Sequence, residues 1–238
     1  MNDVPSLRVV QDKVSLRERT TAVLRNAILT MRFKPGERLV ERQLCLETGV
    51  SRTCIRESMR HLEAEGLVRR EHNKGVVVSS ITATEASEIY EVRRILEAKM
   101  LEKMIRRLDT DIVGRLEASL LRAEECIGRP FEYVSAIGDL IEVLWSGYNN
   151  DTARNLLRSI FDRISYIRVI LSVSTGVDEK RTTVAILHGV LDAIKQRDVI
   201  AAQERYDHYL TRAHDTVVKI ITSNSASNDR LVTQVAIG

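Results

Sequence analysis

Residues 36–66, GERLVERQLCLETGVSRTCIRESMRHLEAEG, predict two helices joined by a tight Gly-Val-Ser turn. Ser51 occupies the position of a helix N-cap, and the helix that it opens is expected to extend to about Ala64. Three apolar residues fall on one face of this second helix and are expected to be buried: Ile55, Met59 and Leu62. The stretch therefore predicts a helix-turn-helix.

The second helix carries cations on its other faces. Arg52, Arg56 and Arg60 are spaced four residues apart, and Thr53 follows the first of them. A helix with this pattern can enter the DNA major groove, with its N-terminal side chains at base edges and phosphates. For a single arginine, a surface ion pair such as Arg56 with Glu57 is the alternative interpretation.

Further signals flank the helix-turn-helix. Residues 15–31 predict a helix opened by a capping box. After the second helix, β-branched runs at 67–68 and 76–78 flank the turn His72–Gly75, which predicts a hairpin with a basic tip, a wing. This wing is the only β-structure that we expect.

From Thr82 onward the chain predicts only helices, and Thr82 with Glu85 predicts a capping box at the start of the first one. The amphipathic segments span about 82–108, 110–127, 130–147, 151–173, 179–196 and 198–222. The predicted fold is mainly α, with a winged helix-turn-helix at 15–80 and an all-helical bundle at 82–222. Residues 1–14 are expected to form a flexible arm and 223–238 a tail.

The charge is unevenly distributed along the chain. Residues 1–80 hold 15 Lys and Arg against 10 Asp and Glu, whereas the remainder holds 21 against 23. A basic first third joined to a nearly neutral remainder fits a nucleic-acid-binding module attached to a second domain.

Composition and motifs exclude several classes of protein. Cys45, Cys54 and Cys126 are far apart, which disfavours a disulfide framework and favours a reducing cytoplasm. No stretch approaches the roughly 18 apolar residues of a membrane span, and no signal peptide is recognisable. We find no nucleotide-binding, zinc-protease or nucleophile-elbow motif, so an enzyme is not expected.

The N-terminal third resembles the winged-helix domain of the GntR family of bacterial transcription regulators. The matching pieces are Lys34–Leu39, Glu41-Arg42, Gly49–Glu57, Leu62–Leu67 and Asn73–Gly75. Residues 84–218 look like the effector domain, called FCD, of the FadR-like subgroup. Its anchors are Glu91–Glu97, Asn150 with Leu156-Leu157, Leu191–Ile194, Asp198 and Ala201-Ala202.

The resemblance implies a DNA-contacting set. These residues are Arg42, Ser51, Arg52, Thr53, Arg56, Lys74 and Gly75. Arginine suits the role because its planar fork grips guanine or phosphate through two hydrogen bonds. At the wing tip, the missing side chain of Gly75 would allow close approach to the DNA.

The resemblance also implies a metal site that this sequence lacks. Many relatives hold a metal through an Asp and three histidines, and the corresponding positions here are Ile137, Ile141, Leu187 and Tyr209. None of these four side chains belongs to the usual zinc ligands, which are imidazole, carboxylate and thiolate. His188 and His208 are each one residue away, which rotates a helical side chain by about 100°. We expect no metal and no cofactor; a rearranged site using His188 with Asp192 is the alternative.

A more apolar effector cavity would follow from these replacements. The resemblance places Arg93 at a position that often faces the cavity, where it would complement an anionic group, although an ion pair with Glu97 is the alternative. Tyr209 could form a hydrogen bond with the same ligand, whereas Arg163, Arg168 and Trp145 are further candidates without an assigned place. The candidate effector residues are Arg93, Ile137, Ile141, Leu187, His188, His208 and Tyr209.

We expect a ligand-responsive transcription regulator, in the usual mode of the family a repressor. It would bind a palindromic operator on double-stranded DNA as a homodimer and respond to a small organic acid, a carboxylate. The alternatives are a metal-dependent regulator of the same family and a DNA-binding protein without a ligand.

Overall fold

The computed structural model describes residues 15–148 and 150–235, with side chains up to residue 223. The expected flexible arm at 1–14 and the last three residues of the expected tail lie outside the described residues. The chain divides between Ser79 and Ser80 into two compact units, and each is considered by itself.

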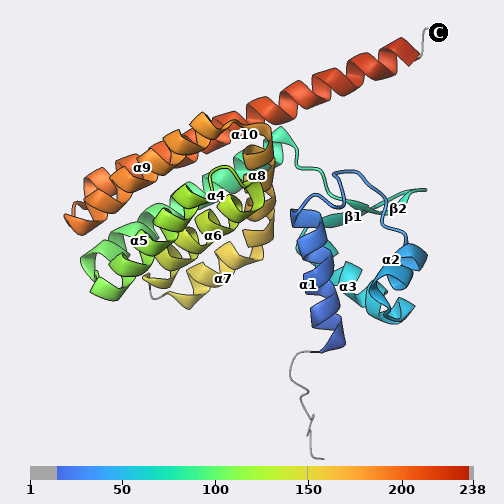
Figure 1. The fold of residues 1–238 in the computed structure, drawn as a ribbon, viewed down its shortest axis with the longest axis horizontal. Coiled ribbons are helices and arrows are strands. Elements are labelled where there is room, and N and C mark those ends of the chain that lie inside the picture. Colours follow the sequence, from blue (N-terminus) through green and yellow to red (C-terminus); the bar gives the residue numbers. More distant parts are fainter. Residues whose placement is uncertain (1–14, 149, 236–238) are drawn as a thin grey trace, which may run out of the picture. The chain divides into compact units, whose positions relative to one another are not determined.

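The first unit is a winged helix-turn-helix (Figure 1). Its elements are α1 (Leu16–Leu29), α2 (Glu41–Thr48), α3 (Arg52–Ala64), β1 (Val68–Glu71) and β2 (Gly75–Val78). The capping box that opens α1 is confirmed, because the Ser15 amide donates to Glu18 Oε2 at 2.9 Å and the Glu18 amide donates to Ser15 Oγ at 3.2 Å. Gly49, at a φ of 71°, closes α2 and turns the chain toward α3.

The wing contains more β-strand pairing than the sequence predicted. Strands β1 and β2 pair antiparallel, with Val68 opposite Val78 and Glu71 opposite Gly75. The segment before α2 adds to them, because Arg38 forms a bridge with Val77. The expectation that the two-stranded wing is the only β-structure is therefore incomplete.

The second unit is an all-helical bundle. Its helices are α4 (Ala83–Arg106), α5 (Thr110–Glu125), α6 (Pro130–Ser146), α7 (Asp151–Ser159), α8 (Phe161–Ser174), α9 (Val177–Lys195) and α10 (Val199–Val235). Helix α10 packs along both α4 and α9, and α6 contacts α4, α5 and α8. The result is a mainly α fold, as predicted.

Three local predictions need correction. The segment expected as one helix over 151–173 is two, α7 and α8, with a break at Ile160. Helix α10 continues past residue 222 to Val235, so most of the expected tail is helical (Figure 1). Thr82 caps α4 by accepting from the Glu85 amide at 3.1 Å, but the Glu85 carboxylate pairs with Arg163.

Among the described residues, no helix combines the length and the apolar content needed to cross a membrane.

Candidate DNA interface and effector cavity

Helix α3 is held by its apolar face and presents its polar one. Ile55, Met59 and Leu62 are at most 1% exposed, which confirms the predicted stripe. Ser51 caps the helix, because its Oγ accepts a hydrogen bond from the Cys54 amide at 3.3 Å. Arg52 lies at the first position of α3, where the partial positive charge of the helix N-terminus also favours binding of a phosphate.

The predicted DNA-contacting residues of α2 and α3 are solvent-exposed. Arg42, Ser51, Arg52, Thr53 and Arg56 all belong to this exposed set. Within the described part of the chain, neither Arg42 nor Arg52 has an ion-pair partner, so both guanidinium groups keep all their N–H donors available.

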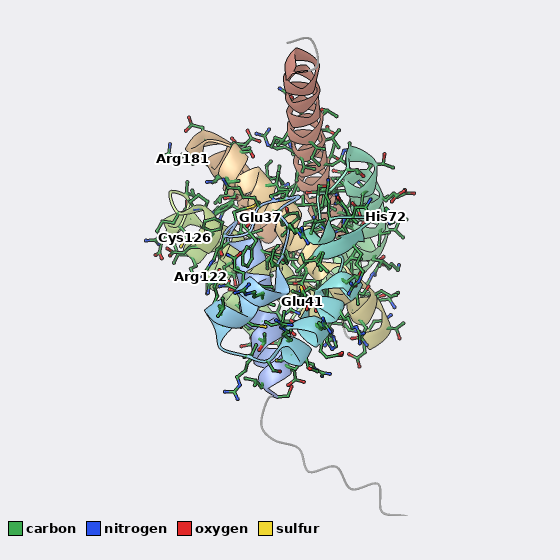
Figure 2. The ribbon with its side chains drawn as sticks, turned by 90° about the vertical axis from the view of Figure 1, so that its right-hand side faces the viewer. Glu37, Glu41, His72, Arg122, Cys126 and Arg181 are labelled. Carbon is green, nitrogen blue, oxygen red and sulfur yellow. The ribbon has the colours of Figure 1, made fainter. Side chains whose placement is uncertain are left out.

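Arg56 differs from the other two arginines because it is paired. Its Nε lies 2.9 Å from both carboxylate oxygens of Glu41, the first residue of α2. Glu41 is labelled in Figure 2. The hydrogen bonds and the charge of Glu41 raise the pKa of Arg56. The alternative of a surface ion pair is therefore found, but not with Glu57, which pairs with Arg60 at 2.8 Å.

The wing tip carries one of the predicted cations in a paired state. Lys74 Nζ lies 3.1 Å from Glu71 Oε2. Asn73 and Gly75 have φ angles of 67° and 81°, a backbone conformation that Gly adopts without strain. A side chain at Gly75 would meet Arg38, whose Nε would lie 3.9 Å from an added Cβ.

Arg38 is a residue that the sequence reasoning missed as a candidate DNA contact. Its exposed guanidinium lies beside the wing turn. The signal was present in the Lys34–Leu39 match, but only the bridge to Val77 brings Arg38 to the wing.

The second unit contains a cavity of about 60 Å³ lined by residues of α4, α6, α8, α9 and α10. A volume of this size can hold a few water molecules or a part of a small ligand. Its walls combine aromatic, apolar and cationic side chains, among them Tyr90, Tyr133, Ile137, Arg168, Lys180 and Tyr209.

Arg168 is the most unusual group in this cavity. It is 5% exposed, and none of its three side-chain nitrogens has a hydrogen-bond partner among the described residues. The guanidinium carbon lies 5.9 Å from the centre of the Phe161 ring, which is its favourable contact. Buried charges in proteins are normally paired, and the N–H donors of this guanidinium are available to an anionic ligand.

The predicted effector residues divide into three groups. Ile137 and Tyr209 line the cavity. Ile141 and Leu187 are buried in the core away from it. His188 and His208 are exposed and lie outside it.

The two exposed histidines lie beside other charged side chains, outside the cavity. His188 Nε2 lies 3.6 Å from Glu124, and His208 borders a shallow hollow beside Arg205. In the described part of the chain, no group of three or more His, Cys, Asp or Glu residues is placed to hold a metal ion.

The structure does not bring Arg93 to the cavity. Arg93 is 1% exposed and pairs with Glu97, with Nε 2.8 Å from Oε1, so the alternative interpretation is the one found. The Tyr206 hydroxyl donates to the same carboxylate. Arg93 also lies over the Tyr90 ring, and this network joins α4 to α10.

A winged helix-turn-helix with exposed arginines, followed by a helical domain whose largely apolar cavity contains a buried cation, defines the class of DNA-binding regulators with a sensory domain. Comparison with known families agrees with this class. Residues 16–78 match "Bacterial regulatory proteins, gntR family", and residues 88–212 match "FCD domain". The chain belongs to the GntR family of bacterial transcription regulators, with an FCD domain as its second unit.

Individual relatives support the same assignment. The HTH-type transcriptional regulator YdhC of Bacillus subtilis is 32% identical over 76% of this chain and 81% of its own length. The gluconate operon transcriptional repressor of Bacillus licheniformis is 33% identical over 45% of this chain and 44% of its own. The solved structure of a putative GntR transcriptional regulator from Rhodococcus sp. RHA1 matches 85% of this chain and 97% of its own, with a TM-score of 0.74 and 26% identity. These relatives are named as regulators, not as enzymes.

Proposed function

We propose that this regulator is a repressor that binds a palindromic operator as a homodimer and is released by a small organic acid. The observation that carries the effector part is the buried, unpaired guanidinium of Arg168. The similarity to a protein named a gluconate operon repressor supports the direction of regulation. A regulator that acts on bacterial DNA would work in the cytoplasm.

DNA recognition would use α3 as the reading helix. Arg52 and Arg42 would contact base edges or phosphates directly, since both are exposed and unpaired in the described part of the chain. Ser51 and Thr53 would contact the backbone beside them. Arg56 and Lys74 would also contact the DNA, with phosphates replacing Glu41 and Glu71 as their ion-pair partners. Gly75 would let the wing backbone approach the DNA.

A homodimer would place two α3 helices on half-sites about 34 Å apart, one helical turn of DNA. Val92 and Ile95 support an apolar contact between copies, because they are 42% and 66% exposed and stand three residues apart on α4. Isologous contacts of this kind produce the twofold symmetry that a palindrome requires.

The effector would bind through a carboxylate at Arg168. A guanidinium forms two parallel hydrogen bonds with a carboxylate, and burial makes this interaction stronger than it is in water. Release from DNA then requires that the acid bind one conformation of the dimer better than the other.

One series of measurements tests the proposal. Sedimentation should give a mass of twice 27.0 kDa, and selection from random duplexes should enrich a palindrome. Fluorescence anisotropy should show tight binding to that duplex, a steep loss with salt and release by an organic acid. Equal affinity for all duplexes would contradict operator recognition, and release that a chelator abolishes would support the metal-dependent alternative.

A further inference from the structure

The effector cavity contains more positive charge than one carboxylate can balance. Three cations line it, Arg168, Lys180 and Arg212, against one carboxylate, Glu179. Glu179 is already used, because its Oε2 lies 2.6 Å from Arg212 Nη2. Among the described residues, Arg168 and Lys180 are therefore two buried cations that no carboxylate contacts.

Lys180 is held by weak contacts only. It is 5% exposed, and its Nζ donates to the backbone oxygen of Ile127 over a long 3.4 Å. The ammonium lies 5.8 Å from the centre of the Tyr133 ring. An ammonium has three N–H donors, so most of its hydrogen-bonding capacity is available to a ligand. Burial lowers the pKa of Lys180, as expected for a cation without a counter-charge.

Two such groups in one cavity are costly unless a ligand compensates them. Burying an ion without a partner is strongly unfavourable, and a core selected for stability alone would replace both cations by apolar residues. A ligand with a single negative group neutralises only one of the two cations. A ligand with two negative groups neutralises both.

We propose that the effector is a small dianion, with one anionic group bound by Arg168 and the other by Lys180. This inference rests on the proposed function, because it specifies the ligand of the same effector site. The guanidinium fork suits two-point contact with a carboxylate or a phosphate, and the ammonium suits a single anionic oxygen. Apolar side chains, including Val134, Ile137 and Leu171, would contact a short carbon chain between the two groups. Dicarboxylates and compact phosphates share this chemistry.

The first experiment uses the ligand-free protein. Arg168→Met and Lys180→Met should each raise the melting temperature by a few degrees, because each removes an uncompensated buried charge. Arg181→Met is the matched control, since Arg181 is exposed on the same helix as Lys180 and pairs with Asp178 at 3.0 Å, and it should leave the melting temperature unchanged (Figure 2). A lowered melting temperature in both cavity variants would show that the cations stabilise the fold, and would overturn the proposal.

The second experiment measures ligand affinity by calorimetry with malonate, succinate, glutarate, inorganic phosphate and butyrate. Butyrate matches succinate in carbon number but has one carboxylate. The best dianion should bind at least about tenfold more tightly than butyrate. Lys180→Met should abolish that preference without lowering the affinity for butyrate, whereas Arg168→Met should lower the affinity for every anion. If the role of Lys180 were purely structural, Lys180→Met would lower the affinities for succinate and for butyrate by the same factor.

The outcomes separate this proposal from the proposed function. If phosphate binds more tightly than all the dicarboxylates, the dianion is a phosphate. If butyrate binds as tightly as the best dianion, the dianion proposal fails, whereas the organic-acid effector stands. If no anion binds the wild-type protein, both fail, and operator binding is judged by its own measurements.

Discussion

Arg56 on α3 and Glu41 on α2 form an ion pair across the helix-turn-helix, with Nε 2.9 Å from each carboxylate oxygen. Both side chains are partly exposed on the surface proposed to contact DNA. A DNA phosphate must therefore compete with Glu41 for Arg56. The carboxylate also repels the phosphate backbone, so the pair disfavours loose binding to any duplex.

Glu41→Gln should increase affinity for DNA of unrelated sequence, by about threefold to tenfold at low salt, because it frees Arg56 and removes a negative charge. Anisotropy titrations with a non-operator duplex measure this increase. Glu57→Gln is the matched control, since it makes the same change of charge but frees Arg60. If both variants increase the affinity for the non-operator duplex by the same factor, net charge alone is responsible and the Arg56–Glu41 pair has no special role.

Arg52→Ala should weaken operator binding by about 1–3 kcal/mol and relax selection at one base pair in each half-site. The reason is that an exposed, unpaired guanidinium at the start of α3 can reach a guanine edge with two hydrogen bonds. Affinities for a set of single-base operator variants measure both effects. A uniform loss over the whole set, without relaxed selection, would identify Arg52 as a phosphate contact.

Most of the helical structure could be predicted from the sequence because its signals are local. Ser15, Ser51 and Thr82 each cap a helix as expected, and their partners lie three residues away. The break at Ile160 could not be predicted, because α7 and α8 meet there without a Gly or Pro to mark it. Helix α10 continues to Val235 although its last residues lack a clear apolar period.

The effector cavity was predicted only in part, because burial depends on tertiary packing. Family positions led to Ile137 and Tyr209, which line the cavity, and their role in binding an effector stays a prediction. Arg93 does not line the cavity but pairs with Glu97, four residues along, which was the alternative that the sequence offered. Arg168 could not be placed, since nothing local shows that its side chain is buried without a partner.

Arg93→Met should lower the free energy of unfolding of the helical unit by about 3–5 kcal/mol, because it leaves the Glu97 carboxylate buried without its cation. Urea unfolding followed by circular dichroism measures the loss. The double variant Arg93→Met, Glu97→Leu should recover much of it, since both charges are then removed. Arg94→Met, which breaks a partly exposed pair with Asp207, should have a small effect. A small loss for Arg93→Met would show that the network contributes little to stability.

Dianion binding should weaken as the pH rises toward 10.5, the ordinary pKa of lysine, because it depends on the charged form of Lys180. Burial lowers the pKa of Lys180 below its ordinary 10.5, so the ligand-free folded protein loses this proton earlier than the unfolded chain does. The cost of burying the ammonium is fully present below the folded-state pKa and disappears as the pH rises through it. Stability of the ligand-free protein should therefore increase with pH in this window.

A bound anion has the opposite effect, because it favours the ammonium and raises its pKa again. Binding then takes up a proton, and affinity decreases as Lys180 becomes neutral. Calorimetry with succinate across this pH range should show the decrease in the wild-type protein and a flat profile in Lys180→Met. Lys195→Met is the control, since Lys195 pairs with Glu117 outside the cavity and its removal should leave the wild-type slope intact. An unchanged slope in Lys180→Met would assign the titration to another group.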